Sequence, residues 1–240
     1  MITQEQIDGL SKLYHIDSFT IEREYLQLVF LSYLYQRKEA RHIYFKGGTA
    51  IRLLFGSARF SEDLDFSTTY SKKEIKKIVK DVEKSIRQEI PKLTILPLYS
   101  GKKTERFRIK YHADENKYPL IVRLDFHKEK KVGKIVISPM LTKFPIVIFP
   151  LVTHLSEREI LGEKIQALIT RGKGRDFFDV WYLLEKGIVP DKKIDKKIIL
   201  QKIKRYSQAS LNRDLSQFLP KSQRALIGLL KERLQNRFKS

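Results

Sequence analysis

Residues 60–67, FSEDLDFS, constrain the fold most, because polar and apolar side chains alternate along them. In an extended strand, residues i and i+2 point to the same face. The polar face then carries Ser61, Asp63, Asp65 and Ser67, and the apolar face carries Phe60, Leu64 and Phe66. Two carboxylates held side by side repel each other, so such a pair favours a cation between them. The pattern predicts a half-buried strand whose exposed face binds a metal ion.

A glycine turn precedes this strand. Residues 42–45 (HIYF) are β-prone, Gly47 and Gly48 follow, and residues 49–55 have helical spacing. Glycines at a turn let backbone N–H groups approach a phosphate closely. A phosphate cradle next to metal-binding carboxylates indicates nucleotide chemistry. The alternative is an edge strand with a solvated polar face, preceded by an ordinary turn.

The net charge points to a polyanionic partner. The chain has 240 residues, with 48 Lys and Arg against 28 Asp and Glu, which gives a formal charge of +20. The excess divides about equally between the stretches before and after residue 156, so it forms a broad basic surface rather than a basic tail. Such a surface suits RNA or DNA. Part of the lysine content could instead reflect adaptation to heat.

Other composition features exclude whole classes of site. The chain has no cysteine, which excludes disulfides, thiolate catalysis and cysteine-based zinc sites. No apolar run approaches membrane-spanning length, and residues 1–10 lack the pattern of a signal peptide. We therefore expect a cytoplasmic protein with no membrane partner.

The hydrophobic period changes along the chain. Residues 3–38 and 71–89 have helical spacing, and helical spacing returns from Ser156 to Arg237. Between them, strands are predicted at residues 93–98, 105–112, 120–127, 134–138 and 145–149. We expect an α+β fold with two domains: residues 1–155 with the sheet and the N-terminal helices, and residues 156–240 as a helical domain.

Asp125, in the segment VRLDFH, is the candidate third carboxylate. It lies in a predicted strand on the face opposite Leu124 and Phe126, and it shares that face with Arg123. Two-metal transfer sites use several bridging carboxylates, and Asp125 could also accept the proton of an attacking hydroxyl. Alternatively, Asp125 forms a salt bridge with Arg123 or with a nearby lysine.

Two groups of cations could track a phosphate backbone. One is the polar face of residues 106–111, and the other surrounds the glycines of the RGKGR turn. The candidates are Arg106, Arg108 and Lys110 in the first group, and Arg171, Lys173 and Arg175 in the second. Both could equally be solvated surface, the second simply a helix connection.

Lys164 falls on the inward stripe that Leu161, Ile165 and Leu168 mark on their predicted helix. A buried ammonium requires an anion. That anion could be a triphosphate, whose charge Lys164 would then stabilise during transfer. It could also be Asp176 or Asp179, which lie one helical turn apart in a mostly apolar segment, and the pairing would then be structural.

Five motifs together resemble the AbiEii/MenT group of nucleotidyltransferase toxins. In order they are FKGGTAIRLLF, RFSEDLDF, VRLDF, EREILGEKIQALITR and RDFFDVWYL, and the resemblance runs from about residue 42 to residue 184. The resemblance implies a polymerase-β-like nucleotidyltransferase core with a mixed β-sheet, followed by a helical C-terminal domain. It also implies Mg²⁺-dependent transfer of a nucleotide from an NTP, in characterised members to the 3′ end of tRNA, and a cognate antitoxin.

The same resemblance assigns roles by position. Asp63 and Asp65 match the metal carboxylates, Lys164 the triphosphate-contacting lysine, and Asp179, with Asp176 as the alternative, the late catalytic aspartate. The nucleotide-binding set becomes Lys46, Gly47, Gly48, Thr49, Ser61 and Lys164. This chain departs from the family by carrying Gly48-Thr49 where Gly-Ser is usual, and Asp125 matches an acidic position that varies in the group.

The sequence therefore predicts an Mg²⁺-dependent nucleotidyltransferase that acts on RNA as the toxin of a toxin–antitoxin system. Two alternatives remain open: the same chemistry on a protein or small-molecule acceptor, and a nucleic-acid-binding protein without catalysis on the same scaffold.

Overall fold

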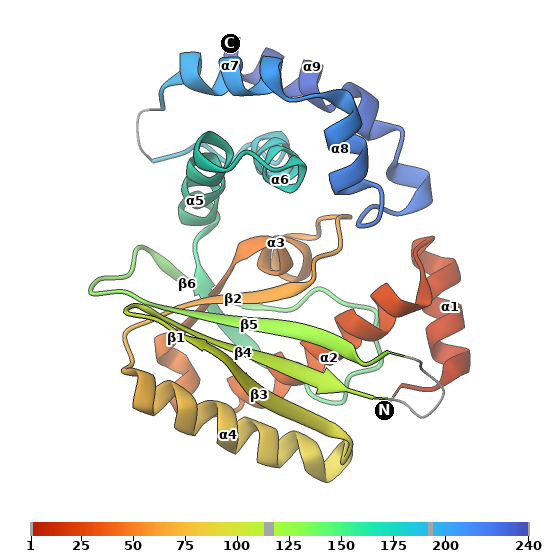
Figure 1. The fold of residues 1–240 in the computed structure, drawn as a ribbon, viewed down its shortest axis with the longest axis vertical. Helices are drawn as coiled ribbons and strands as arrows, with labels where there is room; N and C mark the ends of the chain where they lie inside the picture. The colour runs from red at the N-terminus through yellow and green to blue at the C-terminus, as the bar shows by residue number, and fades with distance from the viewer. Residues whose placement is uncertain (1, 113–117, 192–193, 240) are drawn as a thin grey trace. The chain divides into compact units, whose positions relative to one another are not determined.

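The computed structural model describes residues 2–112, 118–191 and 194–239. The chain divides into two compact units (Figure 1). The first comprises Met1–Gly56 and Phe60–Leu155, and the second comprises Ser57–Arg59 and Ser156–Ser240. Among the described residues, no helix combines the length and apolarity that crossing a membrane requires.

The first unit is built on a seven-stranded mixed sheet in the order β3-β4-β5-β2-β1-β7-β6. Strand β2 pairs in parallel with β5, and β1 pairs in parallel with β7, whereas the remaining neighbours are antiparallel. The strands are β1 Ile43–Lys46, β2 Asp63–Thr68, β3 Leu93–Ser100, β4 Thr104–Tyr111, β5 Leu120–Lys128, β6 Ile135–Pro139 and β7 Leu151–Leu155. With its helices, this sheet confirms the predicted α+β fold.

Apolar side chains on one face of the sheet form the core of the first unit. The helices are α1 Gln4–Tyr14, α2 Ser18–Tyr35, the 3₁₀ turn η1 Lys38–His42, α3 Gly47–Phe55 and α4 Lys72–Glu89. Helices α2 and α4 lie on the same side of the sheet, and α3 lies beside β2 on the other side (Figure 1). Phe66 of β2 stacks on Phe126 of β5 and contacts Phe30 of α2. The opposite, polar face of β2 is therefore turned away from α2.

Two predicted elements differ from the observed ones. The helical stretch predicted for residues 3–38 is interrupted, because His15 is left-handed with φ 52° and Asp17 caps α2 by accepting the Thr20 N–H at 2.9 Å. The prediction of a strand at residues 145–149 is wrong, because the last strand, β7, begins only at Leu151. The Ile146 N–H is used in a turn with the Phe144 carbonyl, and Pro150 has no N–H to donate.

The second unit consists of helices that pack on one another. They are α5 Glu157–Thr170, α6 Gly174–Glu185, α7 Lys196–Arg205, α8 Gln208–Leu215, the 3₁₀ turn η2 Lys221–Gln223 and α9 Leu226–Lys239. Ser156 caps α5 by accepting the Glu159 N–H at 3.4 Å. In α6, which carries the predicted late aspartates, Phe177, Phe178 and Leu183 are buried.

A buried ion pair joins α2 to α3 within the first unit. The guanidinium of Arg52 binds both carboxylate oxygens of Glu24, with Nη2 at 2.9 Å from Oε1. The exposed fractions of the two side chains are 8% and 3%, and the Arg52 guanidinium lies 3.3 Å from the centre of the Phe60 ring. Since α3 follows the glycine turn, this pair fixes the orientation of the predicted phosphate cradle.

Glu24→Gln should lower the free energy of unfolding by about 3–5 kcal/mol, because it leaves the Arg52 charge buried without a counter-ion. Glu62→Gln is the matched control: it breaks the more exposed pair with Arg23, and we expect a loss of about 0–1 kcal/mol. Urea unfolding of both variants measures the difference. Equal, small losses would show that the Glu24–Arg52 pair does not hold α3 in place.

Candidate active site

The polar face of the sheet brings the three predicted metal carboxylates together. Asp63 lies beside Arg123, and Asp65 lies beside Asp125, in the parallel register of β2 and β5. Neighbouring strands lie about 4.8 Å apart, and residues i and i+2 are about 6.6 Å apart along a strand. The three aspartates therefore occupy one compact patch of the sheet, although Asp125 is distant in sequence.

Two of these carboxylates are bound by arginines from neighbouring strands. Arg123 donates from Nε to Asp63 Oδ1 at 2.8 Å and from Nη2 to Oδ2 at 3.1 Å. These hydrogen bonds and the charge of Asp63 raise the pKa of Arg123. Asp125 pairs with Arg106 of β4. The alternative in which Asp125 bridges to Arg123 or a lysine is therefore corrected, because the register places Arg106 directly opposite Asp125.

Asp65 packs against the glycine turn. Gly47 has φ +81°, a conformation that favours glycine, and a Cβ at this position would lie 2.9 Å from Asp65 Cγ and closer still to Oδ2. Only a residue without a side chain allows the turn and the carboxylate to approach so closely. The start of α3, which is buried, and the Asp65 carboxylate are thus in direct contact.

The predicted nucleotide-binding residues lie around the start of α3. Lys46 is the N-cap and supplies no side-chain capping hydrogen bond, so the helix begins with backbone N–H groups that its cap leaves available to an anion. Thr49 is buried and donates its hydroxyl to the Asp63 carbonyl at 2.5 Å. Ser61 precedes β2 rather than lying within it, and its carbonyl accepts from Gln27 at 3.0 Å. The structure gives Thr49 a role in joining α3 to β2, and phosphate binding by this set stays a prediction.

The donor set of the patch suits Mg²⁺. Carboxylate oxygens are the ligands that Mg²⁺ prefers, and phosphate oxygens complete its coordination in nucleotide-binding enzymes. A cation would also remove the repulsion between Asp65 and a phosphate at the start of α3. Within the described residues, no three Asp, Glu or His side chains converge as a ready-made metal site. Asp63 and Asp125 are instead turned to their arginines.

The first predicted group of phosphate-tracking cations shares this face. Arg106, Arg108 and Lys110 alternate along β4 with buried Phe107 and Ile109. Their neighbours across the strand pair are Asp125, Arg123 and Ile121. A row of cations therefore borders the carboxylate patch, although Arg106 is engaged by Asp125.

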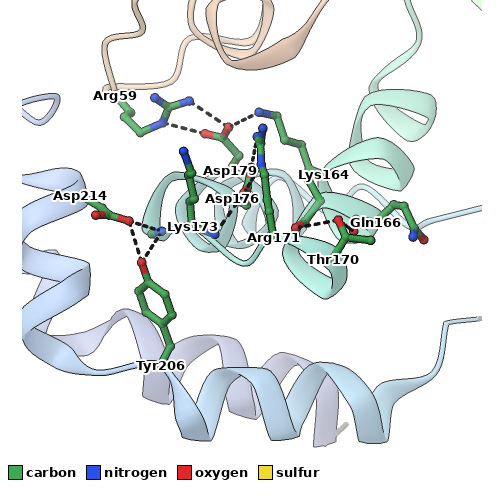
Figure 2. Close-up of polar contacts among 12 residues, drawn as sticks. Arg59, Lys164, Gln166, Thr170, Arg171, Lys173, Asp176, Asp179, Tyr206 and Asp214 are labelled. Atoms are coloured by element: carbon green, nitrogen blue, oxygen red, sulfur yellow. Dashed lines mark hydrogen bonds and ion pairs between the residues drawn. The ribbon is translucent and has the colours of Figure 1, made fainter.

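In the second unit, Asp179 of α6 is the centre of a buried ion cluster (Figure 2). Arg59 donates to both of its oxygens, at 2.8 and 2.9 Å, and Lys164 Nζ lies 2.7 Å from Oδ2. Burial opposes ionisation of Asp179, but the charges of Arg59 and Lys164 outweigh it, so the pKa of Asp179 is lowered. The internal pairing of Lys164 is thus present, and a contact with triphosphate stays a prediction.

Asp176, the alternative late aspartate, is also buried but has other partners (Figure 2). Arg171 binds both of its oxygens at 2.8 Å, and the Lys173 N–H donates to it at 3.3 Å. Arg175 lies with its guanidinium 5.1 Å from the centre of the Phe218 ring. Of the second predicted group of cations, Arg171 is therefore engaged in shaping the turn before α6, and RNA binding by this group stays a prediction.

A family model described as "Nucleotidyl transferase AbiEii toxin, Type IV TA system" matches residues 29–239. The chain belongs to the AbiEii nucleotidyltransferase toxin family. The match covers both the strand with Asp63 and Asp65 and the helices with Lys164 and Asp179. It confirms the family that the ordered motifs indicated.

Known proteins similar to this AbiEii-family chain include one curated relative and two solved structures. An uncharacterised protein of Aquifex aeolicus (strain VF5), aq_aa25, is 29% identical over 147 residues, which are 60% of this chain and 58% of that protein. The chain therefore matches less than two thirds of this relative's length. MenT4, a nucleotidyltransferase toxin from Mycobacterium tuberculosis H37Rv, has a similar fold, with a TM-score of 0.62 and 17% identity, covering 99% of this chain and 89% of MenT4. JHP933 from Helicobacter pylori has a TM-score of 0.54 and 18% identity, covering 93% of this chain and 95% of JHP933.

Two arginines that contact predicted site residues of this AbiEii-family chain were missed from the sequence. Arg59 binds Asp179 across 120 positions, and Arg123 binds Asp63 across 60. Arg123 shared a predicted strand face with Asp125, which was a signal that it lay near the carboxylates. Arg59 opens the motif RFSEDLDF, but no pattern in the sequence linked it to Asp179, because it lies in the short segment before β2.

Gly47→Ala should destabilise the first unit by about 1–3 kcal/mol and displace Asp65, because the new methyl group meets the carboxylate in a strained conformation. Gly9→Ala in α1 is the control, since nothing lies within 4 Å of the added methyl group and alanine favours a helix. Thermal unfolding of both variants measures the effect. A Gly47→Ala protein as stable as the wild type would contradict the close packing of Gly47 on Asp65.

Asp179→Asn should destabilise the second unit by about 3–5 kcal/mol at neutral pH, because Arg59 and Lys164 lose their buried counter-charge. Because the pKa of Asp179 is lowered in the folded state, its contribution is complete above the unfolded pKa of about 3.9 and is lost as the pH falls further. The stabilities of the wild type and the variant should therefore begin to approach each other below about pH 4, and they should become equal only below the lowered folded pKa of Asp179.

Fluorescence of Trp181, the only tryptophan, reports this unfolding, since it contacts Phe178 in α6. Asp191→Asn, at an exposed ion pair with Arg158 in the same unit, is the control. A pH-independent difference between the wild type and Asp179→Asn would contradict the ionised state of Asp179.

Proposed function

We propose that the protein is an Mg²⁺-dependent nucleotidyltransferase that transfers a nucleotide from an NTP to RNA, at the 3′ end of tRNA. The observation that carries the proposal is the patch of Asp63, Asp65 and Asp125 on a polar sheet face beside the start of α3. We further propose that it acts in the cytoplasm as the toxin of a toxin–antitoxin pair, with a separate antitoxin as its partner. Family membership supports this part.

Within this proposal, Asp63 and Asp65 hold Mg²⁺, which supplies positive charge to the phosphates and to the reacting oxygens. The N–H groups at Gly47 and Gly48 bind phosphate oxygens at the start of α3. Lys46, Thr49 and Ser61 complete the nucleotide side, Thr49 by joining α3 to β2. The packing of Gly47 on Asp65 supports this division, since the start of α3 and the Asp65 carboxylate are in direct contact.

The proposed transfer forms one bond at the α-phosphorus and breaks another. The oxygen of a ribose hydroxyl on the acceptor attacks the α-phosphorus of the NTP, and the bond from that phosphorus to the bridging β-phosphate oxygen breaks. Pyrophosphate leaves, and the acceptor gains one nucleotide through a new phosphodiester bond. The hydroxyl proton passes to a carboxylate, for which Asp125 is our candidate in the sheet, because it lies beside Asp65. The resemblance offers Asp179 for the late aspartate and Lys164 for the triphosphate.

The acceptor is proposed to be RNA because of the charge of the surface that borders the patch. The chain carries a formal charge of +20, and Arg106, Arg108 and Lys110 line the same sheet face as the aspartates. Each phosphate that such a surface neutralises releases counter-ions, so RNA affinity should fall steeply with salt.

Asp63→Asn should abolish transfer of label from an α-³²P-labelled NTP to total tRNA in the presence of Mg²⁺. Asp81→Asn, on α4 in a partly exposed ion pair with Arg37, is the matched control and should retain wild-type transfer. Each of the four NTPs is tested separately, with tRNA and with cell protein as acceptors, and folding is checked by circular dichroism.

The outcomes separate the candidate functions. Label on protein but not on RNA would replace the proposed acceptor. Salt-sensitive RNA binding with no transfer under any NTP would favour a binding protein without catalysis. Full transfer by a folded Asp63→Asn variant would contradict the metal assignment.

A further inference from the structure

Asp63 has two roles that compete with each other. In the proposed function it is a metal ligand, and in the structure both of its oxygens accept hydrogen bonds from Arg123. The two hydrogen bonds use one lone pair on each oxygen and hold a positive charge against the carboxylate. Because like charges repel, Arg123 and a divalent cation compete for Asp63.

The exposure of the Arg123–Asp63 pair favours replacement of the arginine by a metal ion. The exposed fractions of the Arg123 and Asp63 side chains are 51% and 26%, so the arginine can swing into solvent without opening the core. By contrast, the Arg59–Asp179 pair has exposed fractions of 2% and 1% and is enclosed. Asp65 has a packing contact of its own, against Gly47.

The Arg123–Asp63 ion pair also stabilises the carboxylate patch in the absence of metal. Asp63, Asp65 and Asp125 lie on adjacent positions of one sheet face, and their mutual repulsion would destabilise the patch. Arg123 and Arg106 neutralise two of the three charges. A half-exposed arginine does this at little cost to a later exchange, because its ion pair is worth little in water.

We propose that Arg123 is a displaceable counter-ion that occupies Asp63 until a divalent cation replaces it, and that Arg123 thereby sets the affinity of the site for metal. The inference rests on the proposed function in one respect, because it takes Asp63 as a metal ligand. When metal binds, the guanidinium is released beside the ion, on the face where the triphosphate is proposed to lie.

Competition between Arg123 and the metal ion for Asp63 determines how much Arg123 weakens metal binding. The apparent dissociation constant for metal equals the intrinsic constant divided by the fraction of molecules in which Asp63 is free of Arg123. A half-exposed pair of the strength usual at surfaces leaves Asp63 free in about one molecule in five. Removing Arg123 should therefore tighten metal binding about fivefold, which corresponds to about 1 kcal/mol.

The test is Mn²⁺ binding to the full chain without nucleotide, followed by electron paramagnetic resonance of the free ion. Arg123→Gln is compared with Arg108→Gln, which removes the same charge from the same sheet face. Arg108 lies opposite Arg123 on β4, one strand further from Asp63, so it controls for the general electrostatic effect. Arg123→Lys keeps the positive charge but loses the bidentate contact with Asp63. It replaces Arg123→Gln in the comparison if Arg123→Gln folds poorly.

We expect Arg123→Gln to bind Mn²⁺ about fivefold more tightly than the wild type and clearly more tightly than Arg108→Gln, with Arg123→Lys in between. Without metal, Arg123→Gln should melt at a lower temperature than the wild type, and saturating Mn²⁺ should raise its melting temperature more. Equal affinities for Arg123→Gln and Arg108→Gln, or weaker binding by Arg123→Gln, would overturn the inference.

Asp63→Asn separates this failure from a failure of the proposed function. If Asp63→Asn weakens Mn²⁺ binding while Arg123→Gln and Arg108→Gln behave alike, the metal site stands and only the counter-ion role is lost. If Asp63→Asn leaves Mn²⁺ binding unchanged, Asp63 is not a ligand, and both the metal assignment and the counter-ion role are overturned.

Discussion

The parallel pairing of β2 with β5 is the constraint on which the candidate site depends. It places Asp65 beside Asp125 and Asp63 beside Arg123, although the two strands are separated by α4, β3 and β4 in the chain. A shift of one residue in this register would turn the aspartates of one strand toward the apolar core. The stacking of Phe66 on Phe126 opposes such a shift, because both rings lie on the buried face. The packing of the core therefore determines the arrangement of the charges.

The carboxylate–arginine pairs of the chain fall into two kinds, buried and exposed. Asp179 and Glu24 are enclosed with arginines, and such pairs resist separation because breaking them strands a charge in the interior. Asp63 and Asp125 have arginine partners too, but their pairs lie at the surface of the sheet, where exchange with water or a metal ion costs little. The first kind suits a structural role, and the second suits a site that must bind and release a ligand.

Local patterns predicted much of this structure, and long-range pairing limited the rest. The alternation in residues 60–67 predicted the shared face of Asp63 and Asp65, and the glycine turn predicted the start of α3. The partner of Asp125 was not predictable, because Arg106 reaches it only through the β4–β5 register. Residues 145–149 (PIVIF) are a short β-prone apolar run, yet Val147 is 89% exposed, since a turn and Pro150 keep this segment out of the sheet. Arg59 could not be found either, because its contact with Asp179 depends on the packing of α6.

The central claim is that the carboxylate patch beside α3 binds the metal and the phosphates of an NTP. Anomalous scattering from crystals grown with Mn²⁺ and a non-hydrolysable NTP analogue tests it most directly. The account predicts an anomalous peak between the carboxylates of Asp63 and Asp65, phosphate density at the start of α3, and an Arg123 side chain turned away from Asp63. Bound nucleotide with its Mn²⁺ peak elsewhere, and Arg123 still paired with Asp63, would contradict it.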